Sequence, residues 1–242
     1  AKEVRHVLEI TDAIAGFLKS NFDFVSITNN HYLMDIRSFS WQGYHVSVQY
    51  TYHVDLGLVN MSQITPNSRN KISNARKTGI IVEEMERPDM AYELLEKTYY
   101  RKGKSPPVTY EQFEKIYTRQ GREKIRLLFA KLPDSEKAAA VNITVTDTER
   151  KTGYSLLRGF NPEYKDSNAA SLLQLKEILY LQEKGFKMLD LVGAENQSIA
   201  LFKSEFGGKL IPYYQVWHAS TSYRIFNMAS MLNPFERPKN RH

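Results

Sequence analysis

Cysteine is absent from this sequence of 242 residues, and its absence removes several classes of site at once. Thiolate nucleophiles, thiolate-bound metals, iron–sulfur clusters and disulfides all require it. Long apolar runs are lacking too. No run approaches the roughly 20 residues that a membrane span needs, and the N-terminal AKEVRHVLEITD is too charged for a signal peptide. We therefore expect a cytoplasmic protein with no membrane span.

The rest of the composition is that of a globular protein. Hydrophobic residues make up 42% of the chain and charged residues 25%, and Gly (12) and Pro (9) are at ordinary levels. These values exclude the disordered and collagen-like classes, and the length allows one or two domains. The net charge of +6 fits an anionic partner, whether nucleic acid, a phosphorylated cofactor or a membrane surface.

Hydrophobic periodicity predicts two elements in the first 60 residues. Apolar positions at helical spacing predict a helix over residues 2–20. From Tyr44 to Leu56 the alternation is strict: apolar residues such as Val46, Val48 and Tyr50 share one face, and polar residues share the other. This pattern is typical of a half-buried strand.

Short strands and helices mix in the remainder of the chain. Thr65-Pro66 and Gly79 bracket a basic helix over 67–78. The later predicted elements are strand 80–84, helices 89–102 and 109–120, strands 124–131, 138–146 and 152–160, helix 167–184, strand 187–192, helix 198–206, strand 209–217 and a final helix near 220–232. This order indicates an α/β or α+β fold.

Two segments, 69–84 and 168–217, resemble the signatures of one enzyme superfamily. The first has the pattern R-x-x-I-x-x-A-x-K-x-G, and the second has a D-x-x-G strand end followed by an F-K-x-x-F-G helix. The matching residues are Arg69, Ile72, Ala75, Lys77 and Gly79, then Asp190 and Gly193, then Phe202, Lys203, Phe206 and Gly207. With the order of elements, they resemble the GNAT acyltransferases, in the Fem-type and BioF2-like branch that contains the peptidoglycan bridge-forming enzymes.

The resemblance implies a GNAT-like acyl-CoA N-acyltransferase fold, in which helices flank a mixed central sheet. Members of this branch carry two tandem GNAT-like domains. We accordingly expect a partial N-terminal GNAT-like domain at 1–65, a basic connecting helix at 66–79 and the acyltransferase domain at 80–242. The N-terminal domain is then either truncated or naturally reduced.

A covalent nucleophile is not evident, because both cysteine and a G-x-S-x-G elbow are missing. The resemblance implies that an amine attacks an ester or thioester directly while the enzyme positions both and stabilises the oxyanion. By resemblance, Lys203 neutralises charge on the acyl group beside Phe202, a substrate-binding residue; otherwise Lys203 is a solvated lysine. Asp190 interrupts an apolar strand, and it either orients or deprotonates the acceptor amine or caps a neighbouring loop.

Positive charges are the candidates for binding an anionic substrate. Arg69, Lys71, Arg76 and Lys77 crowd one short helix with no acid among them, which fits either a phosphate-bearing substrate or a solvated basic face.

Strand 152–160 supplies two further candidates for substrate binding, Arg158 and Tyr154. Alternation predicts that Arg158 shares a face with Tyr154, Leu156 and Phe160. Its guanidinium then meets a phosphate or carboxylate of the substrate, or forms a structural ion pair.

The N-terminus of helix 167–184 offers backbone N–H groups to an anion, so Asn168, Ala169 and Ser171 are the predicted contacts to the donor. The loop before it, 161–166, has no glycine, whereas ordinary GNAT enzymes hold the coenzyme A pyrophosphate with a glycine-rich turn. His45 and His53 lie about 26 Å apart along one strand, too far to share a metal. We predict no metal site and no covalently bound cofactor.

Three functions follow from these observations. The first is an N-acyltransferase that uses acyl-CoA as donor and an amine acceptor such as an amino sugar or cell-wall precursor. The second is an aminoacyl-tRNA-dependent Fem-type transferase acting on peptidoglycan; residues 85–121 hold only two short helices and no long arm for tRNA, which favours the first. The third is a catalytically silent fold that binds an anion or nucleic acid through helix 67–78.

Overall fold

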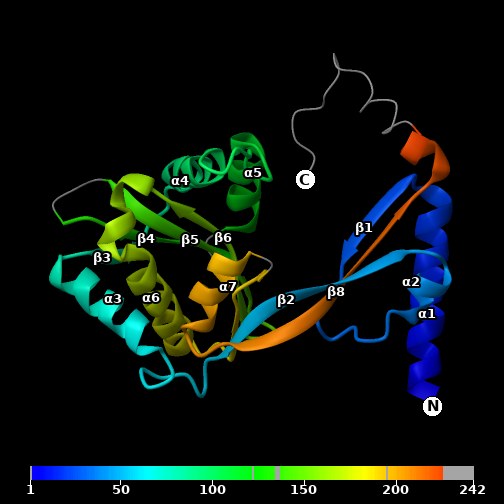
Figure 1. Ribbon diagram of the computed structural model, residues 1–242, viewed down its shortest axis with the longest axis horizontal. Coiled ribbons are helices and arrows are strands. Elements are labelled where there is room, and N and C mark those ends of the chain that lie inside the picture. The colour runs from blue at the N-terminus through cyan, green and yellow to red at the C-terminus, as the bar shows by residue number, and fades with distance from the viewer. Residues whose placement is uncertain (1, 122, 134–136, 195, 226–242) are drawn as a thin grey trace. The chain divides into compact units, whose positions relative to one another are not determined.

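The structure is a computed structural model that describes residues 2–121, 123–133, 137–194 and 196–225 (Figure 1). The chain divides into two compact units. Unit 1 contains the residues up to Thr51 and those from Ile211 onward, and unit 2 contains Tyr52–Leu210. The strand that begins at Lys209 therefore belongs largely with the N-terminal unit, although its sequence position is in the segment assigned above to the acyltransferase domain.

In the described residues, unit 1 is built from helices that pack on a small group of strands. Its elements are α1 (Lys2–Asn21), β1 (Phe24–Thr28), α2 (Arg37–Trp41), most of β2 (His45–Asp55) and most of β8 (Lys209–Ala219). β1 pairs antiparallel with β8. Buried side chains of α1, α2 and the strands form a small core, among them Ala15, Phe39 and Val216. The predicted α1 and β2 are confirmed, whereas β1 and α2 were not predicted.

Burial of the apolar face of β2 changes along the strand. Val46, Val48 and Tyr50 are exposed, at 38%, 47% and 43%, whereas Val54 on the same face is fully buried, and Thr51 on the opposite face is only 3% exposed. The prediction that burial follows the apolar alternation is therefore wrong over residues 46–50 and holds at Val54. Alternation separates two faces of a strand, but the packing of other elements decides which face is covered.

Unit 2 is a mixed sheet between two layers of helices. Its elements are α3 (Pro66–Lys77), β3 (Ile81–Glu84), α4 (Pro88–Tyr100), α5 (Tyr110–Gln120), β4 (Ile125–Lys131), β5 (Ala138–Asp147), β6 (Thr152–Phe160), the 3₁₀ helix η1 (Pro162–Ser167), α6 (Ala169–Glu183), β7 (Met188–Asp190) and α7 (Gln197–Ser204). The complete strand order is β1-β8-β2-β7-β6-β5-β4-β3. The β6 and β7 strands run parallel, and their neighbours pair antiparallel. The α/β class and the meander β4-β5-β6 are as predicted.

Alternating side chains of the central strands pack into two separate hydrophobic cores, one on each side of the sheet. In β4, Leu128 and Ala130 pack with α3 and α6, whereas Leu127 and Phe129 pack with α4 and α5. Figure 1 shows α3 and α6 on one side of the sheet and α4 and α5 on the other. We call these the α6 face and the α4 face. Every central strand therefore presents side chains to both faces in turn.

A β-bulge in β6 changes the face to which Arg158 points. Thr144 of β5 pairs with Ser155 and Ile143 pairs with Leu157, so Leu156 is an extra residue. Ser155 and Arg158 consequently both point to the α6 face, although they are three residues apart. The prediction that Arg158 shares a face with Tyr154 is wrong, because a bulge shifts the alternation by one residue.

The helix ends follow the capping signals of the sequence. Thr65 Oγ1 accepts a hydrogen bond from the backbone N–H of Ser68 at the start of α3. Gly79 and Gly185, after α3 and α6, have φ angles of 76° and 73°, a conformation that glycine adopts without strain. Of the helix predicted near 220–232, residues 221–225 are helical, and its later part lies outside the described residues.

Candidate active site

The strands β6 and β7 pair over only a short stretch. Tyr154 lies beside Asp190, the last residue of β7, while β6 continues to Phe160 without a partner from β7. The two parallel strands therefore part at Tyr154 and Asp190, inside unit 2. Several of the residues predicted from the sequence gather at this point.

The pair His53–Asp190 points to the α4 face, because Val54 and Leu189, the next residues along the two strands, pack into the core on the α6 face. His53 of β2 is the cross-strand partner of Asp190, and His53 Nε2 lies 3.3 Å from Asp190 Oδ2. Both side chains are largely buried, at 10% and 13% exposure. The other carboxylate oxygen of Asp190 accepts a hydrogen bond of 2.8 Å from the Val192 N–H. Asp190 thus caps the loop after β7, one of the two roles that the sequence left open, and it also contacts His53, which the sequence did not predict.

His53 was considered only as a metal ligand in the sequence, and its role beside Asp190 was missed. No local pattern reveals this pair, because the two residues are 137 positions apart and meet only when β2 pairs with β7. Tyr154, also predicted to bind substrate, flanks Asp190 on the other side, in β6. The structure therefore places Tyr154, Asp190 and His53 in one row across three strands.

Lys203 anchors α7 to the end of β7. Its Nζ donates to the carbonyl oxygens of Val192 and Gly193, at 2.5 Å each. The helix α7 begins at the cap Asn196, whose side chain accepts from two backbone N–H groups of the first turn. The positive charge of Lys203 therefore lies against the loop that follows Asp190.

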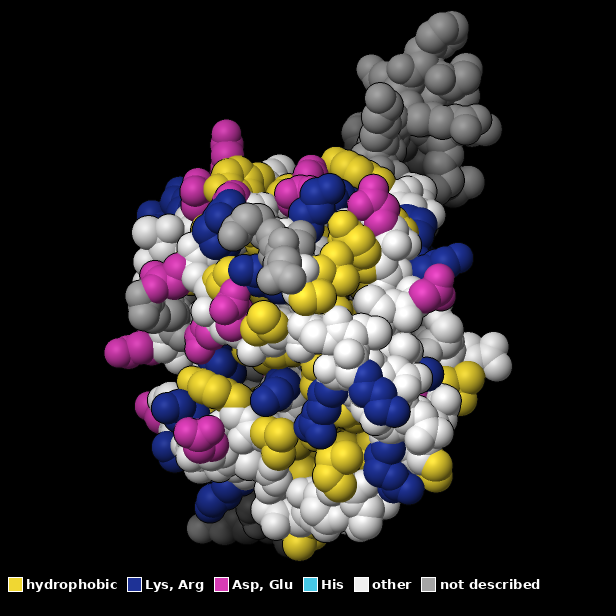
Figure 2. Space-filling view, turned by 90° about the vertical axis from the view of Figure 1, so that its left-hand side faces the viewer, with side chains coloured by type: hydrophobic (Ala, Val, Ile, Leu, Met, Phe, Trp, Pro, Cys, Tyr) yellow, Lys and Arg dark blue, Asp and Glu magenta, His cyan; other side chains and the backbone are white. Residues whose placement is uncertain are grey.

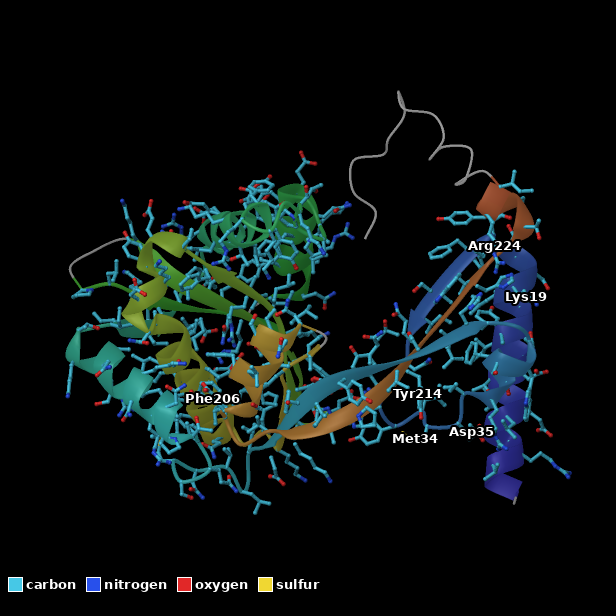
Figure 3. The ribbon with its side chains drawn as sticks, in the orientation of Figure 1. Lys19, Met34, Asp35, Phe206, Tyr214 and Arg224 are labelled. Atoms are coloured by element: carbon cyan, nitrogen blue, oxygen red, sulfur yellow. The ribbon has the colours of Figure 1, made fainter. Side chains whose placement is uncertain are left out.

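The aromatic residues in and just after α7 pack into unit 2. Phe206, which follows α7 and is labelled in Figure 3, is fully buried. Its ring centre lies 5.1 Å from that of Phe202, which is within α7. The guanidinium of Arg158 lies over the Phe202 ring, with its Cζ 4.9 Å from the ring centre. The Phe-Lys pair of the sequence motif therefore contacts both the β7 end and Arg158.

Arg158 is held on the α6 face by two neutral amides. Its Nε donates to Asn142 Oδ1 at 2.7 Å, and its Nη2 donates to Gln174 Oε1. Asn142 and Gln174 are themselves fully buried. Burial lowers the pKa of the Arg158 guanidinium below its usual range, and the charge of Glu177 partly opposes this shift.

Glu177 lies behind these amides as a buried carboxylate with 0% exposure. It accepts hydrogen bonds from Asn142 Nδ2 (2.9 Å), Gln174 Nε2 (2.9 Å), Ser155 Oγ (3.3 Å) and Thr144 Oγ1. An unpaired buried carboxylate is costly, and four donors offset that cost. Glu177 was not predicted from the sequence, because a glutamate in a helix gives no sign of burial.

The basic residues of α3 are divided between local contacts and solvent. Arg69 Nη1 donates to the carbonyls of Met61 and Ile64, and Lys71 lies 3.7 Å from Glu205 at the end of α7. Arg76 is exposed. Figure 2 shows Lys and Arg side chains gathered on the lower half of the side of unit 2 that carries α3.

The N-terminus of α6 is already partly capped. The 3₁₀ helix η1 precedes it, Asn168 adopts a left-handed φ of 59°, and Ser167 Oγ accepts from the N–H of Ala169. Ala169 and Ser171, two of the predicted donor contacts, have buried side chains. At this end the chain offers fewer backbone donors than an uncapped helix would.

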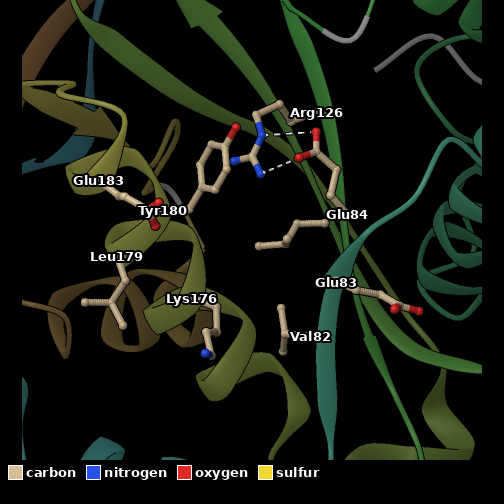
Figure 4. A pocket seen from close by; sticks show the side chains of 9 residues that line it. Val82, Glu83, Glu84, Arg126, Lys176, Leu179, Tyr180 and Glu183 are labelled. Atoms are coloured by element: carbon tan, nitrogen blue, oxygen red, sulfur yellow. Dashed lines mark hydrogen bonds and ion pairs between the residues drawn. The ribbon is translucent and has the colours of Figure 1, made fainter.

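A pocket of about 410 Å³ lies elsewhere in unit 2, between β3, β4 and α6 (Figure 4). Its central cation, Arg126, forms an ion pair of 2.9 Å with Glu84 and stacks on Tyr180 with its Cζ 3.1 Å from the ring centre. The positive charge of Arg126 is therefore compensated by the carboxylate of Glu84 and by the ring of Tyr180. None of the predicted site residues lines this pocket.

The structure thus brings Tyr154, Asp190, Phe202, Lys203 and Arg158 to the region where β6 and β7 part, and leaves the α3 cations and the α6 N-terminus outside these contacts. Among the described residues, no cluster of His, Asp and Glu has the arrangement of a metal site. Within the same residues, no helix combines the length and the hydropathy that crossing a membrane requires.

Comparisons with known proteins agree on the fold. The family model of the acetyltransferase (GNAT) domain matches residues 66–203. A comparison with curated proteins found no match. The C-terminal domain of a protein described as a lysylphosphatidylglycerol synthetase, from Agrobacterium fabrum, is similar with a TM-score of 0.66 and 11% identity, over 93% of this chain and 77% of that chain. The crystal structure of FemX is similar with a TM-score of 0.64 and 12% identity, over 91% and 78%.

A GCN5-related N-acetyltransferase from Sphaerobacter thermophilus is similar as well, with a TM-score of 0.54 and 17% identity, over 81% of this chain and 59% of that chain. At these identities the likeness concerns the fold. The GNAT fold predicted from the sequence is confirmed, and FemX shares that fold.

Proposed function

Because the chain belongs to the acetyltransferase (GNAT) domain family, we propose that it is an N-acyltransferase that moves an acyl group from an activated donor to an amine. The observation that carries the proposal is the end of β7. There the pairing of β6 and β7 stops, and Asp190 with His53 and the ammonium of Lys203 lie around the same loop. This set provides a proton acceptor and a fixed positive charge without a covalent nucleophile.

The proposed reaction is a direct transfer. The amine nitrogen attacks the acyl carbonyl carbon, a C–N bond forms, and the C–S or C–O bond to the leaving group breaks. The amine loses one proton and the leaving group gains one. His53, oriented by Asp190, accepts the proton of the amine, since a histidine held by a carboxylate is a common general base.

Lys203 supports the acyl group in this scheme. Its ammonium, fixed by two carbonyls at the end of β7, counters the negative charge that develops on the acyl oxygen. The same two hydrogen bonds also hold the loop after Asp190. The lysine therefore contributes both charge and geometry.

The proposed donor is acyl-CoA, and the proposed acceptor is an amine of an amino sugar or cell-wall precursor. A second donor, aminoacyl-tRNA, is favoured by one observation. The start of α6 follows a glycine-free 3₁₀ turn, and Ser167 already occupies the N–H of Ala169. An ester donor does not need a pyrophosphate site there, whereas coenzyme A bound in the usual GNAT manner does.

The test is an acyl-transfer assay on the purified protein, with acetyl-CoA, longer acyl-CoA and aminoacyl-tRNA as donors and amino-sugar or peptidyl amines as acceptors. Mass spectrometry of the acceptor detects the added acyl group. Product from acyl-CoA supports the first donor, and product from aminoacyl-tRNA alone supports the second. Salt-dependent binding to RNA with no product from any donor would instead identify a silent binding protein.

The site is tested with three variants and one control. His53→Gln and Asp190→Asn should each lower kcat by about 100-fold or more, the usual contribution of a general base. Lys203→Ala should also abolish most turnover. His45→Gln is the matched control, because His45 lies in the same strand but is exposed and stacks on Trp217. Equal kcat for the His53 and His45 variants would remove His53 from the mechanism.

A further inference from the structure

The guanidinium of Arg158 presents two edges, and only one of them is occupied. Nε and Nη2, which share one edge, donate to Asn142 and Gln174. The other edge, formed by Nη1 and Nη2, has no hydrogen-bond partner in the part of the chain that the structure describes. The residue as a whole is half-buried. A planar pair of N–H donors on this edge is thus left without a partner among the described residues.

The first edge is held rigidly. Asn142 and Gln174 are fully buried, each accepts from Arg158 with its carbonyl oxygen, and each donates with its amide nitrogen to Glu177. Both amide dipoles are thereby aligned between the carboxylate and the guanidinium. Phe202 covers one flat side of the guanidinium. These contacts fix the direction of the open edge before any ligand binds.

The charge of Arg158 is poorly compensated inside the protein. Its direct hydrogen-bond partners are neutral amides, and the charge of Glu177, which lies behind them, only partly opposes the effect of burial on the Arg158 pKa. Burial lowers the pKa of Arg158, which is the signature of a cation held at a desolvation cost. An anion on the open edge would offset that cost.

We propose that the open edge of Arg158 is a binding site for an oxyanion, a carboxylate or phosphate group of the substrate, and that the buried Glu177 network positions it. Two parallel N–H donors match two oxygens of such a group, which is the geometry that guanidinium binds best. The site lies on the α6 face, whereas His53 and Asp190 lie on the α4 face. The substrate class that follows is an acyl donor or acceptor that carries an oxyanion. This inference rests on the proposed function for its substrate, but not for the binding site itself.

The binding test does not require turnover. Isothermal titration with inorganic pyrophosphate and with succinate, at constant ionic strength set with NaCl, measures the phosphate and carboxylate sources separately. We expect at least one probe to bind the wild-type protein. Arg158→Gln should lose at least tenfold in affinity, and Arg158→Lys should fall in between, because lysine keeps the charge but not the fork. Arg76→Gln, an exposed cation of α3, is the control and should bind as the wild type does.

The network is tested by Glu177→Gln, which should weaken the same probe through the orientation of Arg158. If Arg158→Gln does not fold, Arg158→Lys decides alone: unchanged affinity in that variant overturns the inference. Absence of binding by both probes also overturns it. If the protein binds a probe through Arg158 but has no transferase activity, this inference stands and the proposed function is wrong. If Arg158→Gln transfers acyl groups with an unchanged KM, the proposed function stands and this inference is wrong.

Discussion

Replacing Glu177 should reveal how much the buried polar network contributes to the stability of unit 2. Glu177→Ala removes the acceptor of four buried donors and leaves a cavity in α6. Each buried donor left unpaired costs about 1–3 kcal/mol, but Asn142 and Gln174 keep their bonds to Arg158, and the site can relax. We therefore expect a loss of about 3–5 kcal/mol, the range found when a buried charge network is broken.

Thermal and urea unfolding measure this loss. For a protein of 150–250 residues, 1 kcal/mol corresponds to about 2–4 °C in Tm, so the expected decrease is about 6–20 °C. Glu177→Gln should show a smaller decrease in Tm than Glu177→Ala, because the glutamine side chain keeps one acceptor oxygen. A decrease remains because its NH₂ group replaces the other oxygen and faces hydrogen-bond donors. Glu183→Gln, at an exposed position of the same helix, should stay within about 0.5 kcal/mol of the wild type. A Glu177→Ala variant as stable as Glu183→Gln would refute this account of the network.

Three further predictions concern packing, backbone and pH. Gly159→Ala should destabilise unit 2 by about 1–3 kcal/mol in urea unfolding, because the new Cβ would lie 2.7 Å from Leu94 Cβ and 2.8 Å from the Leu94 backbone. Gly16→Ala should stabilise α1 by about 0.4–1 kcal/mol, since the nearest atom would be at 3.5 Å and alanine favours helix; a loss of helicity by circular dichroism would contradict this. Burial alone would raise the pKa of Glu205, but hydrogen bonds from Ser68 and its neighbours on α3 outweigh it and lower this pKa below 4.5. Its contribution to stability is therefore present above pH 4.5 and lost as pH falls through the lowered pKa, so the stability gap between wild type and Glu205→Gln should close in acid; a gap independent of pH would be the contrary result.

The sequence predicted most elements of unit 2 because their signals are local. Prolines, caps and glycines mark the ends of α3, α4 and α6, and alternation marks β4, β5 and β6. Residues 21–43 carry no sustained period, so β1 and α2 went unpredicted. The exposed apolar residues Val46, Val48 and Tyr50 of β2 show the limit of the same method, since a strand's sequence does not say which part of a face its neighbours cover.

The residues of the candidate site were likewise predicted only where their signal is local in the sequence. Asp190, Phe202 and Lys203 lie in short motifs and were found by resemblance. His53 and Glu177 depend on contacts across strands and layers, which no short pattern encodes. The charges of α3 were visible in the sequence, but only the structure shows that Arg69 and Lys71 have local partners.

The bulge in β6 has a consequence for changes in chain length. With Leu156 as the unpaired residue, Ser155 and Arg158 point to the α6 face and Leu157 to the α4 face. Deleting Leu156 would leave Ser155, Leu157 and Arg158 in regular alternation, each still on its present face. A deletion, normally the change that an inner strand tolerates least, is thus at this position compatible with the whole pattern. If all residues were kept and the strand paired regularly without the bulge, the side chain of Arg158 would instead point into the apolar core beneath α4.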